Sequence, residues 1–159
     1  MAELIGNRTR DRQKQTAEVF TPPRLVNEML NNLSPKLWKE NKTFCDPACG
    51  DGNILVVVLE RKVLCGHDPI EALKTIYGVE LMRDNSKDCR KRLYGIVKNR
   101  MEENGDMLVA GDPNYQKIRR ILVNQIVWAD SLKYDYEFST DSDNRNGEAK
   151  GLEETHYST

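Results

Sequence analysis

The stretch Asp-Pro-Ala-Cys-Gly-Asp-Gly-Asn, residues 46–53, constrains the fold more than any other part of the chain. A short β-capable segment, residues 42–45, precedes it, and an uninterrupted apolar run, residues 54–59, follows it. This order predicts a strand, a glycine-rich turn and a helix. Gly50 and Gly52 allow backbone conformations that a Cβ would forbid, and the free N–H groups of the following helix favour a negatively charged group at the turn. We therefore expect a ligand at the carboxyl end of this strand, beside Asp46.

Length and charge restrict the possible classes of protein. A chain of 159 residues is expected to form one domain, and its net charge of −1 limits any nucleic-acid surface to a local patch. The sequence has no run of 18 apolar residues and no apolar signal core at its N-terminus, so we expect a cytoplasmic protein without membrane contact. The four scattered cysteines are expected to be free thiols, and a less favoured alternative is a zinc site formed by Cys45, Cys49, Cys65 and His67.

A capped amphipathic helix is predicted before the glycine-rich turn. Thr21 suits an N-cap, the two prolines after it suit a first helical turn, and apolar residues then recur at helical spacing up to Leu30. Residues 1–17 form a polar and basic arm. We interpret the arm either as a solvated segment or as one that contacts phosphate or covers a ligand.

Two later segments also read as strands that end in an acid. Residues 75–81 are β-branched and aromatic and contain Glu80, and residues 126–128 lead to Asp130. Between them we expect a long helix, Asp84 to about Asn104, with a basic, solvated face. That face comprises Arg90, Lys91, Arg92, Lys98 and Arg100. Ser34, Asp68 and Asp112 each precede a proline and are predicted to cap further helices.

Nicotinamide and flavin sites need a third glycine where this chain has Leu55. The Asp-Pro-x-x-Gly-x-Gly stretch instead resembles the signature of S-adenosylmethionine-dependent DNA methyltransferases, most closely the adenine-amino class. The Phe-Thr-Pro segment and the strand-terminal Glu80 and Asp130 extend the resemblance, in the family's order, over residues 18–138. It implies an α/β, Rossmann-like methyltransferase fold with a truncated parallel sheet of three to four strands flanked by helices. Residues 133–138 are the candidate fourth strand.

The resemblance also implies a set of residues that contact S-adenosylmethionine. Phe20, Thr21 and Pro22 would lie at its methionine end, Glu80 would accept hydrogen bonds from the ribose hydroxyls, Leu81 would pack on the adenine ring, and Asp130 would accept a hydrogen bond from the adenine amino group. The remaining members of the implied set are Asp46, Pro47, Ala48, Gly50, Gly52, Asn53, Ser131 and Leu132.

The family's catalytic loop, Asn/Asp-Pro-Pro-Tyr/Phe, does not appear between Asp130 and residue 159, and we expect the chain to lack a target-recognition domain. Its nearest counterpart is Asp112-Pro113-Asn114-Tyr115, which precedes the third motif. We favour a capped helix start there, and a displaced loop with Asp112 and Tyr115 as catalytic residues is the weaker alternative.

The resemblance implies a restriction-modification type of DNA N(6)-adenine methyltransferase that acts alone or within a split or oligomeric enzyme. The alternatives are an inactive cofactor-binding or regulatory subunit and, least favoured, a methyltransferase for another substrate. DNA is the implied partner. We expect the edge of the first strand to be covered by residues 133–138, by a second copy or by another polypeptide. Residues 139–159 are acidic and poor in apolar side chains, and we predict a disordered tail.

Overall fold

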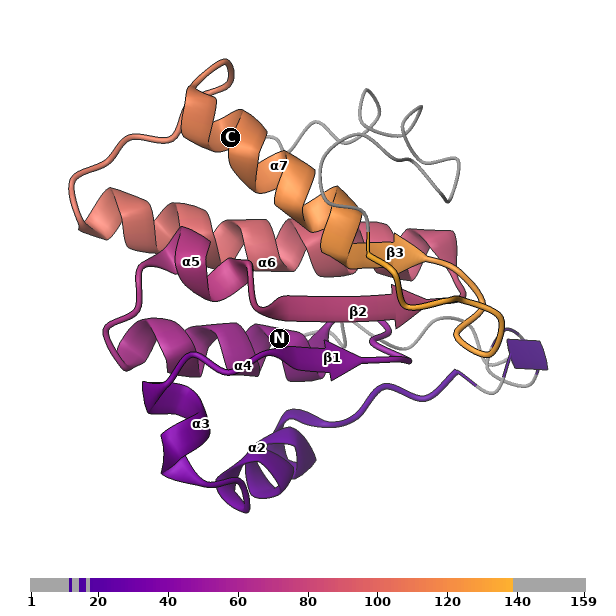
Figure 1. Ribbon diagram of the computed structural model, residues 1–159. Helices are drawn as coiled ribbons and strands as arrows, with labels where there is room; N and C mark the ends of the chain where they lie inside the picture. Colours follow the sequence, from indigo (N-terminus) through magenta and orange to yellow (C-terminus); the bar gives the residue numbers. More distant parts are fainter. Residues whose placement is uncertain (1–11, 13–14, 17, 139–159) are drawn as a thin grey trace, which may run out of the picture.

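The computed structural model describes Arg12, Gln15, Thr16 and residues 18–138. Its centre is a parallel sheet of three strands, in the order β1-β2-β3 (Figure 1). The strands are β1 (Phe44–Asp46), β2 (Ile76–Glu80) and β3 (Ile126–Trp128). The predicted α/β fold with a truncated parallel sheet is therefore confirmed. Most of the predicted N-terminal arm and all of the predicted acidic tail lie outside the described residues.

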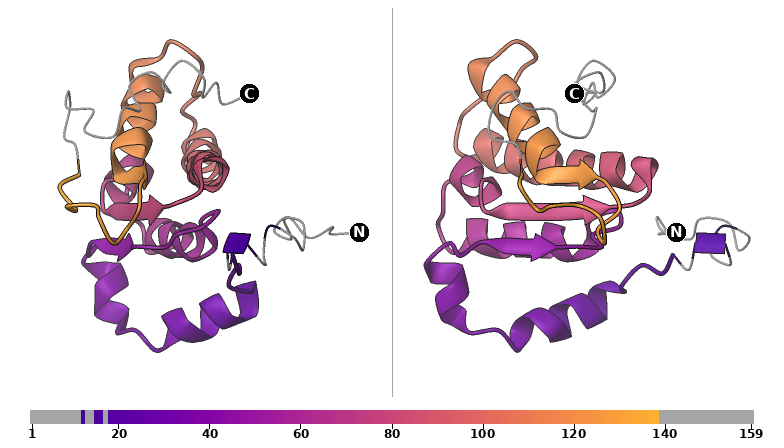
Figure 2. Two further views of the ribbon diagram at one scale, coloured as in Figure 1. Left: turned by 90° about the vertical axis from the view of Figure 1, so that its right-hand side faces the viewer. Right: turned by 45° about the vertical axis from the view of Figure 1, so that its right-hand side comes forward.

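Two helices, α4 (Asn53–Leu64) and α6 (Arg83–Glu103), lie together on one face of the sheet (Figure 2). Their apolar side chains pack against the strands to form the core, which includes the fully buried Val58, Leu59 and Leu93. The loop that follows β3 lies on the opposite face (Figures 1 and 2). The other helices are α2 (Pro23–Asn31), α3 (Pro35–Lys39), α5 (Pro69–Leu73) and α7 (Pro113–Gln125). None of the helices in the described ranges is long and apolar enough to cross a membrane.

Local capping chemistry decides where most helices begin. The side chains of Ser34, Asp68 and Asp112 accept hydrogen bonds from backbone N–H groups in the first turns of α3, α5 and α7, as predicted. The prediction for Thr21 is wrong. Because α2 begins at the second proline, the N-cap position falls on Pro22. Proline has no side-chain oxygen that could accept a hydrogen bond from the first backbone N–H groups of the helix.

The predicted fourth strand at residues 133–138 is also wrong. The N–H groups of Lys133 and Tyr134 turn back to the carbonyl oxygen of Asp130, at 3.0 and 2.9 Å. Tyr136 has a φ of 57°, which an extended strand cannot contain. The alternating aromatic residues pack on one another, and Phe138 contacts Tyr77 of β2 with ring centroids 4.7 Å apart. The segment therefore covers a face of the sheet, and within the described residues β1 pairs only with β2.

A buried lysine joins three segments at the amino-terminal end of the sheet. Lys62 of α4 is fully buried, and its ammonium donates to Asn41 Oδ1 at 3.0 Å, to Thr75 Oγ1 at 2.5 Å and to the carbonyl oxygen of Lys42. Burial lowers the pKa of Lys62 to about 8. The side chain thus holds α4 to the residues that lead into β1 and β2.

Candidate functional site

The glycine-rich turn joins the carboxyl end of β1 to the start of α4. Gly50 and Gly52 have φ values of 56° and 93°, in the left-handed region that favours glycine. Gly52 is also the N-cap of α4, and a Cβ added to it would lie 2.7 Å from the sulfur of Cys89 on α6. The close approach of α6 and the positive φ therefore both require glycine at this position.

Glu80, the last residue of β2, connects the turn to the start of α6. Its Oε2 accepts a hydrogen bond from the N–H of Gly50 at 2.9 Å, and its Oε1 accepts one from the N–H of Met82 at 2.8 Å. The residue is only 8% exposed, so it is not a solvated strand end. The side-chain amide of Asn85 also donates to Oε1, at 3.4 Å. A carboxylate has about four acceptor sites, so about one is left for a hydroxyl group of a ligand.

The Phe-Thr-Pro segment lies against the same turn. The side-chain amide of Asn53 donates to the carbonyl oxygen of Thr21 at 3.0 Å. A Cβ added to Gly50 would lie 3.3 Å from the ring of Phe20. The Phe-Thr-Pro segment and the glycine-rich turn, which are separate in the sequence, are thus in contact in the structure.

An arginine of α6, which sequence reasoning did not assign to the site, clamps the turn. Arg92 donates to the carbonyl oxygen of Asp51 at 3.0 Å and to Asn53 Oδ1 at 2.7 Å, and it forms an ion pair with the Asp51 carboxylate at 3.1 Å. Asp51 is 4% exposed, so its charge is balanced inside the protein. The clamp fixes the backbone of the turn from outside the motif.

The predicted solvated face of α6 is therefore wrong at two positions. Arg92 is half-buried at the turn, and Arg90 is buried and donates through Nε to the carbonyl oxygen of Ile126 at 2.8 Å. Helical spacing could have predicted that these two arginines face protein. Arg90 precedes the buried Leu93 by three positions, and Arg92 follows the buried Cys89 by three. Both arginines lie on sides of the helix that face protein.

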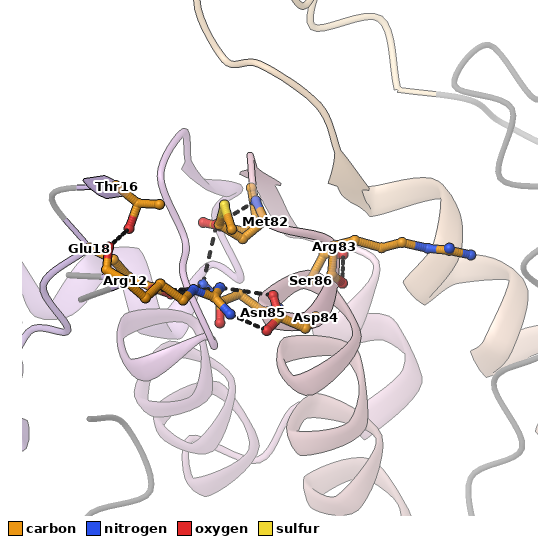
Figure 3. Close-up of polar contacts among 9 residues, drawn as sticks. Arg12, Thr16, Glu18, Met82, Arg83, Asp84, Asn85 and Ser86 are labelled. Atoms are coloured by element: carbon orange, nitrogen blue, oxygen red, sulfur yellow. Dashed lines mark hydrogen bonds and ion pairs between the residues drawn. The ribbon is translucent and has the colours of Figure 1, made fainter. Parts of the chain in front are cut away.

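Arg12 ties the N-terminal segment to the start of α6 (Figure 3). Its Nη2 donates to Asp84 Oδ1 at 2.9 Å, and its Nε lies 2.8 Å from Glu18 Oε2. The hydrogen bond to Asp84 is the main cause that raises the pKa of Arg12. Glu18 also accepts a hydrogen bond from Asn85, which in turn lies 3.4 Å from Glu80. The network links Arg12 of the arm, through Glu18 and Asn85, to the carboxylate at the end of β2.

The residues after β2 and β3 expose apolar surface at the same edge of the sheet. Leu81 is 61% exposed and Leu132 is 94% exposed, and isolated apolar side chains of this size at a strand end suit contact with a flat ring. Asp130 is half-buried, and its Oδ1 accepts a hydrogen bond from the N–H of Leu132 at 3.0 Å. Ser131 lies between Asp130 and Leu132 in the turn after β3, and its carbonyl oxygen accepts a hydrogen bond from the hydroxyl group of Tyr136.

Asp46 lies at the end of β1, before the exposed Pro47 and Ala48. Its Oδ1 accepts a hydrogen bond from the N–H of Ala48 at 3.0 Å. Burial nevertheless raises the pKa of Asp46, and the hydrogen bond only partly opposes this effect. A cationic group of a ligand would stabilise the charged carboxylate here.

The structure does not bring the two weak catalytic candidates to this edge. Asp112 Oδ1 accepts a hydrogen bond from the N–H of Asn114 at 2.7 Å, which confirms the helix-start interpretation. Tyr115 is 4% exposed and packs edge-on against Tyr94, with ring centroids 6.0 Å apart. Helix α7 begins at the end of the molecule opposite the carboxyl ends of the strands (Figure 1). Both residues therefore have structural roles.

The alternative zinc site does not form in the structure. Within the described residues, no three or more His, Cys, Asp or Glu side chains gather in a way that could hold a metal ion. Cys45 and Cys65 are exposed free thiols, and Cys49 and Cys89 are buried ones. The ring of His67 instead lies with Nε2 2.6 Å from the carbonyl oxygen of Trp38.

Comparison with known proteins gives a match for the region that contains most of this site. Residues 3–106 match the family model described as N-6 DNA Methylase. The matched range includes the Phe20 segment, the glycine-rich turn, Glu80 and Arg92, and it ends before β3. No curated protein and no solved structure matched the chain.

Proposed function

The chain belongs to the N-6 DNA methylase family, and from this premise we propose that residues 18–138 bind S-adenosylmethionine as the cofactor-binding part of a DNA N6-adenine methyltransferase. One observation carries the proposal. The motifs that the resemblance assigns to the cofactor meet at the carboxyl edge of the sheet, joined by Gly50 to Glu80 at 2.9 Å and by Asn53 to Thr21 at 3.0 Å. Ligands of open α/β sheets bind at this edge.

The residues present fit the chemistry of this cofactor. Glu80 offers an acceptor for a ribose hydroxyl, the exposed Leu81 offers an apolar surface for a purine ring, and Asp130 offers an acceptor for an amino group. Phe20 and Thr21 lie at the turn, where the methionine end is proposed to bind. Burial raises the pKa of Asp46, and a bound cation would favour its charged form. When bound, S-adenosylmethionine supplies an activated methyl group to the acceptor amine.

The adenine that receives the methyl group must also be held in place. An exocyclic adenine amine is a weak nucleophile, and correct positioning of reacting groups can contribute about 7–11 kcal/mol. The sequence contains no Asn/Asp-Pro-Pro-Tyr/Phe loop, and Asp112 and Tyr115 are used for helix capping and core packing. We propose that a second polypeptide or a second copy holds the flipped base. The β1 edge, which pairs only with β2 among the described residues, is the proposed docking site.

The placement of Asp112 and Tyr115 also favours a second candidate function. In this alternative the chain binds the cofactor without chemistry of its own and regulates an active methyltransferase. The two candidates differ in one observable. The first predicts methyl transfer to DNA once the partner is supplied, whereas the second predicts that an active partner transfers methyl groups without this chain.

The cofactor proposal is tested by isothermal titration calorimetry with S-adenosylmethionine. Glu80→Gln keeps the side-chain volume but removes the charge, and we expect binding to weaken by about 1.5–3 kcal/mol, the range for a hydrogen bond to a charged group. Glu60→Gln removes an exposed carboxylate from α4 and should leave affinity unchanged. Thermal unfolding of both variants without ligand separates lost binding from lost folding.

Two results would contradict the proposal at different levels. If Glu80→Gln binds as tightly as the wild-type chain, then Glu80 serves only the backbone of Gly50 and Met82. If the wild-type chain gives no saturable heat with S-adenosylmethionine, then the cofactor assignment itself is wrong.

A further inference from the structure

Residues 18–21, which we call the strap, run between the start of α6 and the start of α4. The side-chain amide of Asn85, the third residue of α6, donates a hydrogen bond to Glu18 Oε1. At the other end, the side-chain amide of Asn53, the first residue of α4, donates to the carbonyl oxygen of Thr21 at 3.0 Å. Asparagine side chains of the two helices that follow β1 and β2 therefore hold both ends of the strap.

Asn85 also contacts the carboxylate that is proposed to bind the ribose. Its Nδ2 lies 3.4 Å from Glu80 Oε1, so one side-chain amide donates to both Glu18 and Glu80. An amide nitrogen carries two N–H groups, one for each carboxylate. Asn85 is fully buried and Glu80 is nearly so, and hydrogen bonds in such surroundings are stronger than the same bonds in water. The position of the Glu80 carboxylate therefore depends on the same group that holds the strap.

An arginine fastens the Glu18 end of the strap to the same turn of α6 (Figure 3). Arg12 Nε lies 2.8 Å from Glu18 Oε2, and Arg12 Nη2 donates to Asp84 Oδ1 at 2.9 Å. Because Asp84 and Asn85 are consecutive, neighbouring residues of α6 hold Arg12 and Glu18. The side chain of Glu18 is 9% exposed and that of Arg12 is 23% exposed, so this pair is less screened by water than a surface ion pair. The linked contacts thus fix the strap beside the Glu80 carboxylate.

Building on the proposed function, we propose that Asn85 is a positioning residue for the ribose of the cofactor and that the strap acts on the ribose through it. Without the Asn85 amide, Glu80 Oε1 keeps the N–H of Met82 at 2.8 Å but loses a side-chain donor. The carboxylate then has more freedom, and a ribose hydroxyl has to order it on binding. Groups that are held in place before the ligand arrives bind it more tightly, because this ordering cost is already met. Loosening of Glu18 acts in the same direction, since Asn85 then loses the contact that helps to orient its amide.

The test uses isothermal titration calorimetry of the full chain with S-adenosylhomocysteine and with its 2′,3′-dideoxy analogue, which lacks both ribose hydroxyls. The ratio of the two affinities, the ribose ratio, reports the contact with the hydroxyls. In the wild-type chain we expect a ribose ratio of about ten or more, the range for a hydrogen bond to a charged group. Asn85→Ala should lower the ribose ratio at least about five-fold and change binding of the analogue less than about two-fold. General damage to the site would weaken both ligands alike.

A double-mutant cycle shows whether Asn85 acts through Glu80. In the Glu80→Gln background, Asn85→Ala should change the ribose ratio less than about two-fold, because the carboxylate that the amide positions is already absent. An effect of Asn85→Ala that is equally large in both backgrounds would contradict this route.

Arg12→Met tests the strap at a half-buried position, where the chain should fold even if Asn85→Ala does not. The variant should lower the ribose ratio about two-fold or more, because Glu18 loses its cationic partner and orients Asn85 less firmly. Arg24→Met is the matched control. It removes an exposed arginine that pairs with Glu28 at 2.9 Å on α2, and it should leave the ribose ratio unchanged.

Three results would overturn the role of Asn85 and the strap while leaving the proposed function intact. The first is a ribose ratio near one in the wild-type chain. The second is an unchanged ribose ratio in Asn85→Ala, with or without an equal loss of both ligands, which would leave Asn85 a structural role only. The third is an equal ribose ratio in Arg12→Met and Arg24→Met. Absence of saturable binding of S-adenosylhomocysteine by the wild-type chain would instead overturn the proposed function together with this role.

Discussion

Replacement of Gly52 by alanine probes the packing that forms the candidate cofactor site. The added Cβ would meet two separate obstacles. Gly52 has a φ of 93°, a conformation that L-residues adopt at a cost of about 1–2 kcal/mol. The Cβ would also lie 2.7 Å from the sulfur of Cys89, closer than carbon and sulfur can approach without movement of α6 or of the turn. Overpacking of this kind typically costs about 1–3 kcal/mol.

A second glycine in the chain, Gly66, allows the conformational cost of a positive φ to be measured alone. Gly66 has a φ of 95°, and a Cβ added there would have no atom within 4 Å. Gly66→Ala should therefore destabilise the protein by the conformational cost alone, about 1–2 kcal/mol. Gly52→Ala should cost about 2–5 kcal/mol, the sum of both effects. The difference between the two variants measures the steric conflict with Cys89.

A double-mutant cycle isolates that conflict. Cys89→Ala removes the sulfur and leaves the Cβ and Cα of residue 89 at 3.3 and 3.4 Å from the added Cβ. Gly52→Ala should therefore cost clearly less in the Cys89→Ala background than in the wild-type chain, and its cost should approach that of Gly66→Ala. The free energies of unfolding come from urea titrations followed by circular dichroism. Titration of S-adenosylmethionine into the same four proteins reports whether affinity follows the geometry of the turn. Equal destabilisation by Gly52→Ala and Gly66→Ala, or a Gly52→Ala cost that persists without the sulfur, would refute this reasoning.

Three further predictions concern charge and activity. Burial lowers the pKa of Lys62 to about 8 from 10.5, so the lysine of the unfolded chain binds its proton more tightly than that of the folded chain. The free energy of unfolding should therefore rise between pH 8 and pH 10.5 by at most about 3 kcal/mol, relative to Lys62→Met. Urea titrations of the two proteins should diverge across this range. Arg92→Met should destabilise the protein by about 1–3 kcal/mol because it removes the ion pair between Arg92 and the buried Asp51, whereas Arg100→Met, which removes an exposed ion pair, should cost less than about 1 kcal/mol. Thermal unfolding that ranks the two variants equally would contradict the clamp. The purified chain alone should transfer little or no tritiated methyl from S-adenosylmethionine to unmethylated DNA, and robust transfer by a monomer would show that the base-holding groups lie within this chain.

Features that depend on neighbouring residues were predictable from the sequence. Asp68 and Asp112 cap helices because the accepting carboxylate and the donating N–H groups lie within one turn of each other. The strand before the turn and the one at residues 126–128 were predicted for the same local reason. Glu80 was placed at a strand end by its position in the chain, but its hydrogen bond from the N–H of Gly50, 30 positions earlier, was not predicted.

Features that depend on distant residues were not predictable in this way. Arg92 contacts Asp51 over 41 positions of sequence, and its basic character alone favoured a solvated face. The alternation of residues 133–138 fits both a strand and a turn with stacked rings. The hydrogen bonds of Lys133 and Tyr134 to Asp130, the contact between Phe138 and Tyr77 and the positive φ of Tyr136 distinguish the two. Contacts between residues so far apart in the sequence cannot be predicted from composition or periodicity.

The hydrogen bonds of Asn53 have a consequence for the order in which the site is assembled during synthesis. This one amide donates to Thr21, 32 residues earlier in the chain, and accepts from Arg92, 39 residues later. A ribosome therefore synthesises the glycine-rich turn before it synthesises the arginine that fixes the turn. Closure of a long segment has to precede the contact that stabilises it, which delays such contacts in folding. A nascent chain that ends before α6 consequently carries the complete glycine-rich motif but not the clamped turn, and a ligand specific for the clamped turn would bind only after α6 has docked.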